Sequence, residues 1–271
     1  MTKNCILMSI YRNDSLTGFR DCIKSLNLNK NDVTLYLAID GPIQDDLRQY
    51  ITSLEQNTQT KLFQFEESEG LTKRLNFLID QALNCSAHQL FFRMDADDVA
   101  LNERILKQSE FMKSRVDIDV VASHSQDIWP DGKIFTRSLP LKNKQILRAM
   151  TCRNPIKHST VCFRRSILER GHRYNEYFKK SQDRVLWVDI LKNDGFFEIM
   201  PEIFIEYRHN DTLIMRKKNF QTIKYTFLGQ LYAIFNLRPF SIFPYFHLIA
   251  MLISKLLPTP ITRTLYRKLE K

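Results

Sequence analysis

Glycine, proline and cysteine are scarce in this sequence of 271 residues, which contains 7 glycines, 9 prolines and 5 cysteines. So few glycines and prolines, together with 44% hydrophobic residues, exclude a fibrous or disordered chain and favour a compact core. The cysteines are odd in number and form no C-x-x-C pair, which argues against a disulfide framework or a zinc knuckle. The first residues also lack the pattern of a secretory signal, because Lys3 precedes a short apolar run that soon meets Arg12. These absences favour a cytoplasmic protein with one large domain, or with one domain and an appended piece.

Acidic residues are nearly absent from the last part of the chain. From Leu213 onward only Glu270 opposes ten basic residues, so this tail carries +9 of the net charge of +10. Basic and apolar residues in one segment favour an anionic membrane surface over a nucleic acid. The apolar run 241–257 is interrupted by Pro244 and His247 and falls short of the roughly 20 clean residues of a spanning helix. We therefore expect a basic amphipathic helical tail over residues 213–271 that attaches to a membrane peripherally. The alternative is a helical pair packed on the core with a solvated basic face.

Apolar runs and helical patterns alternate through the first part of the chain. Continuous apolar runs predict buried strands, and apolar residues at helical spacing predict the helices between them. The predicted strands are 5–10, 33–39, 61–65 and 90–94, and the predicted helices are 16–28, 45–54, 71–83 and 101–113. After residue 115 the pattern predicts strands at 120–122, 125–129, 133–137, 160–164 and 203–207, with helices at 141–150 and 183–191. This alternation predicts an α/β fold with a largely parallel sheet.

Three carboxylates, Asp95, Asp97 and Asp98, directly follow the predicted strand 90–94. Carboxylates are poor core material without partners, but they suit a hard divalent cation that keeps positions open for water and phosphate oxygens. In an open α/β sheet, ligands bind outside the carboxyl ends of the strands. The pattern therefore predicts a metal–diphosphate site. An acidic turn in which Asp98 caps the next helix is the alternative, and a D-x-D pattern alone does not decide between the two.

With its segments laid end to end, the chain resembles the family 2 glycosyltransferases of the GT-A fold. More narrowly, it resembles the bacterial branch that assembles O-antigen, capsule and exopolysaccharide units. Three blocks carry the resemblance: 92–98 (FRMDADD) with 102–104 (NER) and Gln108; 154–161 (NPIKHSTV) with 164–166 (RRS); and Asp183 with Leu186-Trp187. The resemblance runs from about Cys5 to Arg216. It implies a GT-A, Rossmann-like, mixed and mainly parallel sheet flanked by helices over residues 1–212, with a nucleotide-sugar half of about 1–115 and an acceptor half of about 116–212.

The resemblance also implies a UDP-sugar donor and its contacts. Tyr11 and Asp40, which follow the first two strands, would bind uracil by stacking and by accepting a ring N–H. Lys73, in a glycine-led turn into a helix, would contact the nucleotide. Asp95 would contact the ribose and Asp97 would bind Mn²⁺ or Mg²⁺, whose charge stabilises the departing diphosphate. The alternatives are a turn-capping role for Asp40 and a solvated helix face for Lys73.

For the acceptor side, the resemblance implies that Asp183 is the catalytic base. An inverting transfer needs a carboxylate to remove the proton of the acceptor hydroxyl, and the start of a helix favours the charged carboxylate. Much of the family has Glu-Asp here, whereas this chain has Gln182-Asp183, and a simple helix cap is the alternative. Other positions imply further contacts that solvated charges explain equally well: His158 lining the acceptor pocket, His209 as a third metal ligand, and Arg208, Arg216 and Lys217 near phosphates.

The function implied is an inverting, metal-dependent transfer of a hexose, galactose or N-acetylglucosamine, from a UDP-sugar. The implied acceptor is a polyprenyl-diphosphate-linked saccharide at the cytoplasmic face of a bacterial inner membrane. One competing hypothesis is a sugar nucleotidyltransferase, but its G-x-G-x-R turn is missing from residues 10–14 (IYRND). Another is a basic nucleic-acid-binding protein, which needs positive charge across a folded face, whereas the first 212 residues carry only +1. We therefore expect no nucleic-acid partner.

Overall fold

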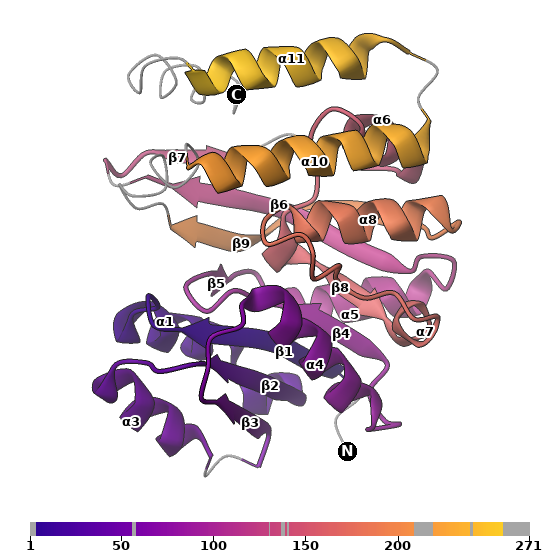
Figure 1. Cartoon of the computed structure of the whole chain (residues 1–271). Coiled ribbons are helices and arrows are strands. Elements are labelled where there is room, and N and C mark those ends of the chain that lie inside the picture. Colours follow the sequence, from indigo (N-terminus) through magenta and orange to yellow (C-terminus); the bar gives the residue numbers. More distant parts are fainter. Residues whose placement is uncertain are drawn as a thin grey trace.

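The computed structural model describes residues 4–55, 58–129, 131–136, 139, 141–208, 219–238 and 241–256. Nine strands of this described part form one sheet in the order β3-β2-β1-β4-β8-β6-β9-β5, with β7 paired to β6 (Figure 1). Strands β1 to β4 run parallel to one another, β8 runs antiparallel between β4 and β6, and β6 is parallel to β9. The strands are β1 (Asn4–Tyr11), β2 (Val33–Asp40), β3 (Thr60–Phe65), β4 (Leu90–Arg93), β5 (Val99–Ala100), β6 (Val120–Ile128), β7 (Ile134–Thr136), β8 (Cys162–Arg164) and β9 (Phe197–Arg208). The predicted mixed, mainly parallel α/β fold is confirmed.

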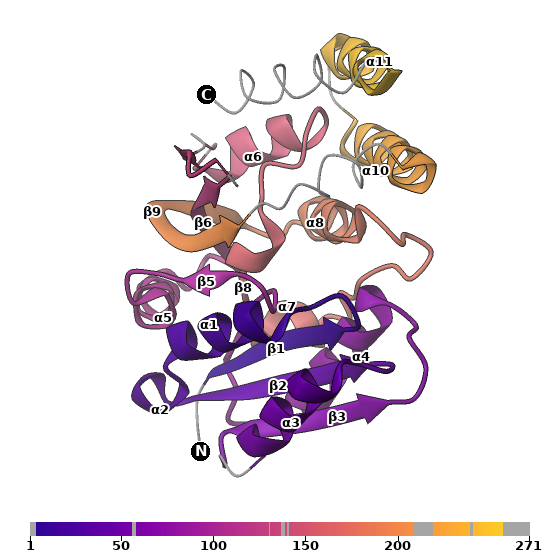
Figure 2. The ribbon, with the colours of Figure 1, turned by 90° about the vertical axis from the view of Figure 1, so that its left-hand side faces the viewer.

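Helices cover both faces of this sheet (Figure 2). Successive side chains of a strand point to opposite faces, so Ile6 and Met8 of β1 join one apolar cluster and Cys5 and Leu7 the other. The first cluster packs against α1, α3 and α5, and the second against α4, α6, α7, α8 and α10. The helices are α1 (Leu16–Leu26), α2 (Leu28–Asn31), α3 (Asp45–Leu54), α4 (Leu71–Leu83), α5 (Arg104–Ser114), α6 (Asn143–Met150), α7 (Arg165–Glu169), α8 (Gln182–Lys192), α10 (Phe220–Leu237) and α11 (Phe243–Leu256).

Element boundaries in the second part differ from those predicted. The two predicted strands 120–122 and 125–129 form the single strand β6, which a bulge around His124 interrupts. The predicted strand 203–207 is the end of the longer β9, and the predicted strand 160–164 is a strand only from Cys162, because a 3-10 turn (His158–Thr160) precedes it. Helix α5 begins at Arg104 instead of 101, since the two residues before it adopt left-handed backbone conformations.

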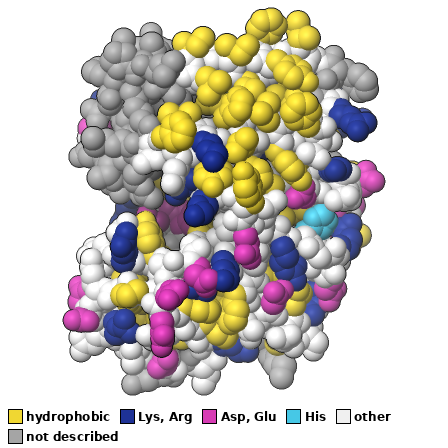
Figure 3. Space-filling model, viewed as in Figure 1, with side chains coloured by type: hydrophobic (Ala, Val, Ile, Leu, Met, Phe, Trp, Pro, Cys, Tyr) yellow, Lys and Arg dark blue, Asp and Glu magenta, His cyan; other side chains and the backbone are white. Residues whose placement is uncertain are grey.

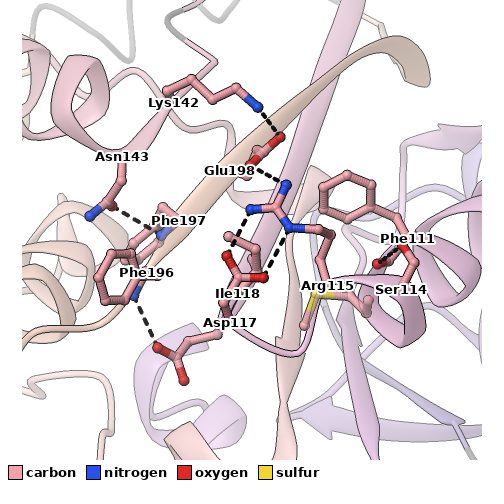
Figure 4. A network of polar contacts seen from close by, with 12 residues as sticks. Phe111, Ser114, Arg115, Asp117, Ile118, Lys142, Asn143, Phe196, Phe197 and Glu198 are labelled. Carbon is pink, nitrogen blue, oxygen red and sulfur yellow. Dashed lines mark hydrogen bonds and ion pairs between the residues drawn. The ribbon is translucent and has the colours of Figure 1, made fainter.

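A polar network joins the start of β9 to the elements beside it (Figure 4). The carboxylate of Glu198 accepts hydrogen bonds from Lys142 Nζ at 2.6 Å and from Arg115 Nη1 at 3.2 Å. Arg115 also donates to both carboxylate oxygens of Asp117, at 2.9 and 2.8 Å. Nearby, the Phe197 N–H donates to Asn143 Oδ1 at 3.0 Å. These contacts hold β9 in place beside β6, so that its far end reaches the region of the site.

The C-terminal helices stack on the domain, with α10 between α8 and α11 in both views (Figures 1 and 2). The Tyr232 hydroxyl of α10 donates to Asp189 Oδ1 of α8 at 2.6 Å, and Lys192 Nζ donates to Asn236 Oδ1 at 2.9 Å. Gly229 permits this close approach, because a Cβ there would lie 3.0 Å from the Cβ of Ser181. Thus α10 packs on the domain, as in the alternative considered for the tail. No helix of the described part is both long enough and apolar enough to cross a membrane.

Candidate active site

The parallel strands bring the predicted donor-binding residues to one edge of the sheet. Tyr11 and Asp40 are direct register partners at the carboxyl ends of β1 and β2. Leu7 of β1 pairs with Arg93 at the end of β4, so Asp95 lies just beyond the same edge. This grouping is the one expected where ligands bind in open α/β sheets.

Asp40 is buried and surrounded by hydrogen-bond donors. Its Oδ1 accepts from the Glu69 N–H at 2.9 Å and from Arg74 Nε at 2.6 Å. Its Oδ2 accepts from the Ser68 hydroxyl at 2.8 Å and from the Gly70 N–H at 2.9 Å. Burial alone would raise the pKa of Asp40, but these donors outweigh it and hold the pKa below its usual range. Because a carboxylate has about four lone-pair sites, a base N–H would have to share one of them. The base-binding role of Asp40 stays a prediction.

The glycine-led turn before α4 carries the predicted Lys73 and, beside it, Arg74; contact of Lys73 with a nucleotide stays a prediction. Gly70 has φ +95°, a left-handed conformation that suits glycine, and α4 starts at the next residue. Arg74 is buried, pairs with Asp40, and lies 3.6 Å from the centre of the Phe65 ring. Lys73 is about half exposed and pairs with Glu69. Arg74 was not among the predicted site residues, although helical spacing from Leu71 to Leu78 places position 74 on the buried side.

The three carboxylates after β4 have three different environments. Asp95 pairs with Arg93. Burial raises the pKa of Asp95, but the charge and hydrogen bond of Arg93, together with nearby positive charge such as that of Lys157, outweigh burial and hold the pKa below its usual range. Asp97 is exposed and lies beside the start of α1, where a Cβ on Gly18 would be 3.7 Å from the Cα of Asp97. Asp98 is buried, and burial followed by the charges of Asp95 and Asp97 raises its pKa well above the usual range. Neither of its carboxylate oxygens has a partner in hydrogen-bonding geometry within the described residues, although Ser159 lies beside it.

Asp183 lies at the N-terminal end of α8. Asn154 Nδ2 donates to Asp183 Oδ2 at 2.8 Å, and the Asn154 amide is itself oriented because its Oδ1 accepts the Ile156 N–H at 3.1 Å. Burial raises the pKa of Asp183, and the nearby charge of Asp95 adds to this effect. The structure therefore brings the expected base to within electrostatic reach of the D-x-D segment. A carboxylate whose pKa is raised toward neutrality is better suited to accept a proton.

A match over most of the fold decides the family. The family model described as Glycosyl transferase family 2 matches residues 5–171, which is more than half of the chain and includes β1 to β4 with the D-x-D segment. The chain belongs to glycosyl transferase family 2.

Relatives of this family 2 protein include glycosyltransferases named for amylovoran and O-antigen biosynthesis. The amylovoran biosynthesis glycosyltransferase AmsE of Erwinia amylovora is 25% identical over 222 residues, covering 81% of each chain. The O-antigen biosynthesis glycosyltransferase WbnJ of Escherichia coli is 26% identical over 214 residues, covering 76% of this chain and 79% of WbnJ. Among solved structures, residues 1–349 of S. aureus TarS in complex with UDP-GlcNAc match with a TM-score of 0.64 at 14% identity. That match covers 85% of this chain and 66% of that one, whereas this chain spans only 39% of a longer TarS structure. These structural matches agree with the GT-A fold.

The carboxylate cluster fits the way in which magnesium or manganese binds with a diphosphate. The described residues contain no group of three His, Cys, Asp or Glu side chains that could enclose a metal. Magnesium commonly uses one or two protein carboxylates together with water and substrate phosphates, so such an enclosure is not required. Asp97 is accessible, and within the described part of the chain no hydrogen-bond partner fixes the buried oxygens of Asp98. Asp97 would hold the metal, with Asp98 in support.

His158 packs inside the domain. Its Nε2 lies 2.7 Å from the Tyr174 hydroxyl, and its ring contacts those of Tyr174 and Trp187. Burial, followed by the Arg93 charge, lowers the pKa of His158 to about 3, so the imidazole is neutral near pH 7. Asn76 of α4 exchanges two hydrogen bonds of 2.9 Å with the Tyr174 backbone. Through Tyr174, His158 therefore helps to join the 3-10 turn (His158–Thr160) to α4, and contact with an acceptor stays a prediction.

Of the remaining predicted basic residues, Arg208 lies within the described part of the chain. Arg208 donates to Asp21 Oδ2 at 2.7 Å and to Glu206 Oε1 at 2.9 Å, so it bridges β9 to α1. His209, Arg216 and Lys217 lie outside the described residues, and their roles stay predictions. Lys157, which the sequence analysis did not single out, pairs with the buried Asp127 and contributes positive charge near Asp95 and Asp98. The feature of the sequence that could have indicated Lys157 is its place beside His158 in the block 154–161.

We predict that Asn154 controls the pKa of Asp183, the expected catalytic base. Its N–H stabilises the charged form of Asp183, so replacing Asn154 by alanine should raise the pKa of Asp183. The acidic limb of the plot of kcat/KM against pH should therefore shift to higher pH. On the alkaline side of the profile the activity should be near normal. Asn193→Ala, which removes an amide from the far end of α8, should leave the limb in place. A uniform loss at every pH in Asn154→Ala, with an unshifted limb, would show a merely structural role.

Proposed function

We propose that this protein is an inverting glycosyltransferase that moves a hexose, galactose or N-acetylglucosamine, from a UDP-sugar to a polyprenyl-diphosphate-linked saccharide. The observation that carries the proposal is the juxtaposition of Asp183, whose pKa is raised by burial, with the carboxylate cluster at the end of β4. One carboxylate suits proton removal and the others suit a metal–diphosphate group. The UDP-GlcNAc complex of the TarS neighbour supports the donor class, and the names of AmsE and WbnJ support surface polysaccharide assembly.

The proposed reaction moves one proton from the acceptor hydroxyl to Asp183 and one sugar from UDP to the acceptor oxygen. The Asp183 carboxylate accepts the proton of an acceptor hydroxyl, and the hydroxyl oxygen forms a bond to the anomeric carbon of the donor sugar. The bond from that carbon to the diphosphate oxygen breaks, and its electron pair leaves with UDP. Attack on the face opposite the leaving group inverts the configuration. When bound at Asp97, Mn²⁺ or Mg²⁺ would supply positive charge to the departing diphosphate.

The start of α1 supports the same placement of the diphosphate. The N-terminal end of a helix carries partial positive charge and backbone N–H groups that have no partner within the helix. In this protein the first turn of α1 lies against Asp97, with Gly18 at the contact. An anionic group near Asp97 would therefore meet positive potential from the helix.

We infer that the reaction takes place at the cytoplasmic face of a bacterial inner membrane, because a polyprenyl acceptor stays in a bilayer. The basic, apolar tail supports a peripheral attachment there.

Product analysis tests the proposal. UDP-galactose or UDP-N-acetylglucosamine, Mn²⁺ and a lipid-linked saccharide fraction should give UDP and an acceptor heavier by one hexose or N-acetylhexosamine. A nucleotidyltransferase would instead release pyrophosphate from UTP and a sugar 1-phosphate. Pyrophosphate formation, without transfer from either UDP-sugar, would overturn the proposal in favour of that alternative.

A further inference from the structure

Helix α11 exposes apolar side chains on the face turned away from the domain. Phe246, Ile249 and Ile253 of α11 are between 55% and 62% exposed, and Ile242, directly before the helix, is 72% exposed; these four side chains are here called the α11 stripe. Their spacings of four, three and four residues place them along one side of the helix. Leu248, on the other side, is buried. A helix that is apolar all round belongs inside a large core or in contact with lipid, and the α11 stripe is not covered by the described part of this chain.

The positive charge of the surrounding sequence indicates which kind of partner fits this surface. Residues 213–269 contain nine basic residues and no acidic residue, and residues 243–254 within α11 contain no charged residue at all. An exposed apolar stripe flanked by positive charge matches an anionic bilayer, whose head groups attract Lys and Arg while apolar side chains enter the interface. Apolar side chains also dominate the face over α10 and α11 in Figure 3, whereas charged residues of both signs lie over the lower half.

Helix α10 fixes α11 to the catalytic domain. Gln230 of α10 is buried, and its Nε2 lies 3.3 Å from His247 Nδ1 and 3.4 Å from the Pro244 carbonyl oxygen, to which it donates. Through Gly229, the same helix also contacts Ser181, which precedes Asp183 by two residues. A single stack of helices therefore connects the α11 stripe with the expected catalytic base.

We propose that α11 lies in the plane of an anionic membrane surface with the α11 stripe inserted among the lipids, while α10 remains packed on the protein. This inference rests on the proposed function only for its purpose, namely access to a lipid-linked acceptor. The two helices of the tail then have different roles: α10 packs on the catalytic domain, and α11 makes the membrane contact. The stack then holds Asp183 at a fixed height above the bilayer that carries the acceptor.

Vesicle co-sedimentation of the full chain tests the proposal. The unaltered protein should sediment with phosphatidylcholine vesicles that contain phosphatidylglycerol, and less with pure phosphatidylcholine or at high salt. The double variant Phe246→Ser, Ile249→Ser should bind about a hundredfold more weakly, about tenfold for each apolar side chain withdrawn from the interface. Leu106→Ser, Val116→Ser removes two exposed apolar side chains from the α5 region and should bind as the unaltered protein does.

Two outcomes would overturn the proposal. One is vesicle binding by the α11 double variant that equals that of the unaltered protein. The other is self-association of the unaltered protein in sedimentation velocity, without vesicle binding, that the double variant abolishes; the stripe would then join two copies of this chain. Circular dichroism and UDP binding of the double variant establish that it is folded. If the protein bound vesicles but transferred no sugar, the proposed function would be wrong, whereas the proposed membrane contact of α11 would still hold.

Discussion

Replacing Asp183 by asparagine is expected to lower kcat for sugar transfer by about 10²- to 10⁴-fold, the range typical of a lost general base. Asparagine keeps the size of the side chain and an oxygen that can accept from Asn154 Nδ2, so α8 should keep its position. The variant lacks the carboxylate that takes the acceptor proton, while the donor-binding residues at the ends of β1, β2 and β4 are unchanged. UDP-sugar affinity, measured by calorimetry, should therefore stay close to that of the unaltered protein.

Asp189→Asn is the matched control, because it makes the same change on the same helix at a carboxylate that accepts from Tyr232. Its kcat should be nearly normal. If Asp183→Asn kept more than about a tenth of the activity, Asp183 would not be the base. A parallel loss of UDP-sugar binding in that variant would instead show that Asp183 supports the donor site.

The first part of the fold was predictable because its elements are specified locally. Strands β1, β2 and β4 are buried on both faces and appear as continuous apolar runs. Helices α3 and α4 match the predicted ranges 45–54 and 71–83, since each has a clear apolar stripe between a turn and a loop. The carboxylate cluster followed from the same pattern, because polar residues directly after a buried strand must lie at the edge of the sheet.

The second part was less predictable because its pairing is long-range. Strand β6 passes through a bulge at His124 and pairs with β9, more than seventy residues later, so no local pattern shows that it is continuous. The two-residue strand β5 exists only through its pairing with Ile205 and Glu206 of β9. The packing of α10 on α8 depends on Gly229 and Tyr232, whose partners lie more than forty residues earlier in the chain.

Within the site, the sequence indicated the segments that come together, but it did not indicate every contact that their side chains make. The turn at residues 69–76 was singled out for Lys73, yet the neighbouring Arg74 makes the buried ion pair with Asp40. The block 154–161 was singled out for His158, yet Asn154 contacts the expected base. Such assignments depend on the direction of each side chain, which is set by packing with distant elements such as α8 and β2.

Replacing Asp97 by alanine is expected to weaken UDP binding in the presence of Mn²⁺ by about a hundredfold. A metal bridge between a carboxylate and a diphosphate is worth roughly several kcal/mol, and each 1.4 kcal/mol or so changes the affinity about tenfold. Asp97 is the exposed member of the cluster, so its loss should leave the Asp95–Arg93 ion pair and the buried position of Asp98 unchanged. Calorimetry with UDP and other nucleoside diphosphates, with and without Mn²⁺, measures the effect directly.

The dependence on metal separates ligand loss from structural damage. Removing Mn²⁺ should weaken UDP binding by the unaltered protein to about the level of Asp97→Ala, and Mn²⁺ should no longer strengthen binding by the variant. Asp80→Ala removes an exposed carboxylate from the later part of α4 and should keep the full response to Mn²⁺. If Asp97→Ala bound UDP as tightly as the unaltered protein with Mn²⁺ present, Asp97 would not be the metal ligand. If the folded, unaltered protein bound no nucleoside diphosphate at all, it would share the family fold without the proposed donor chemistry.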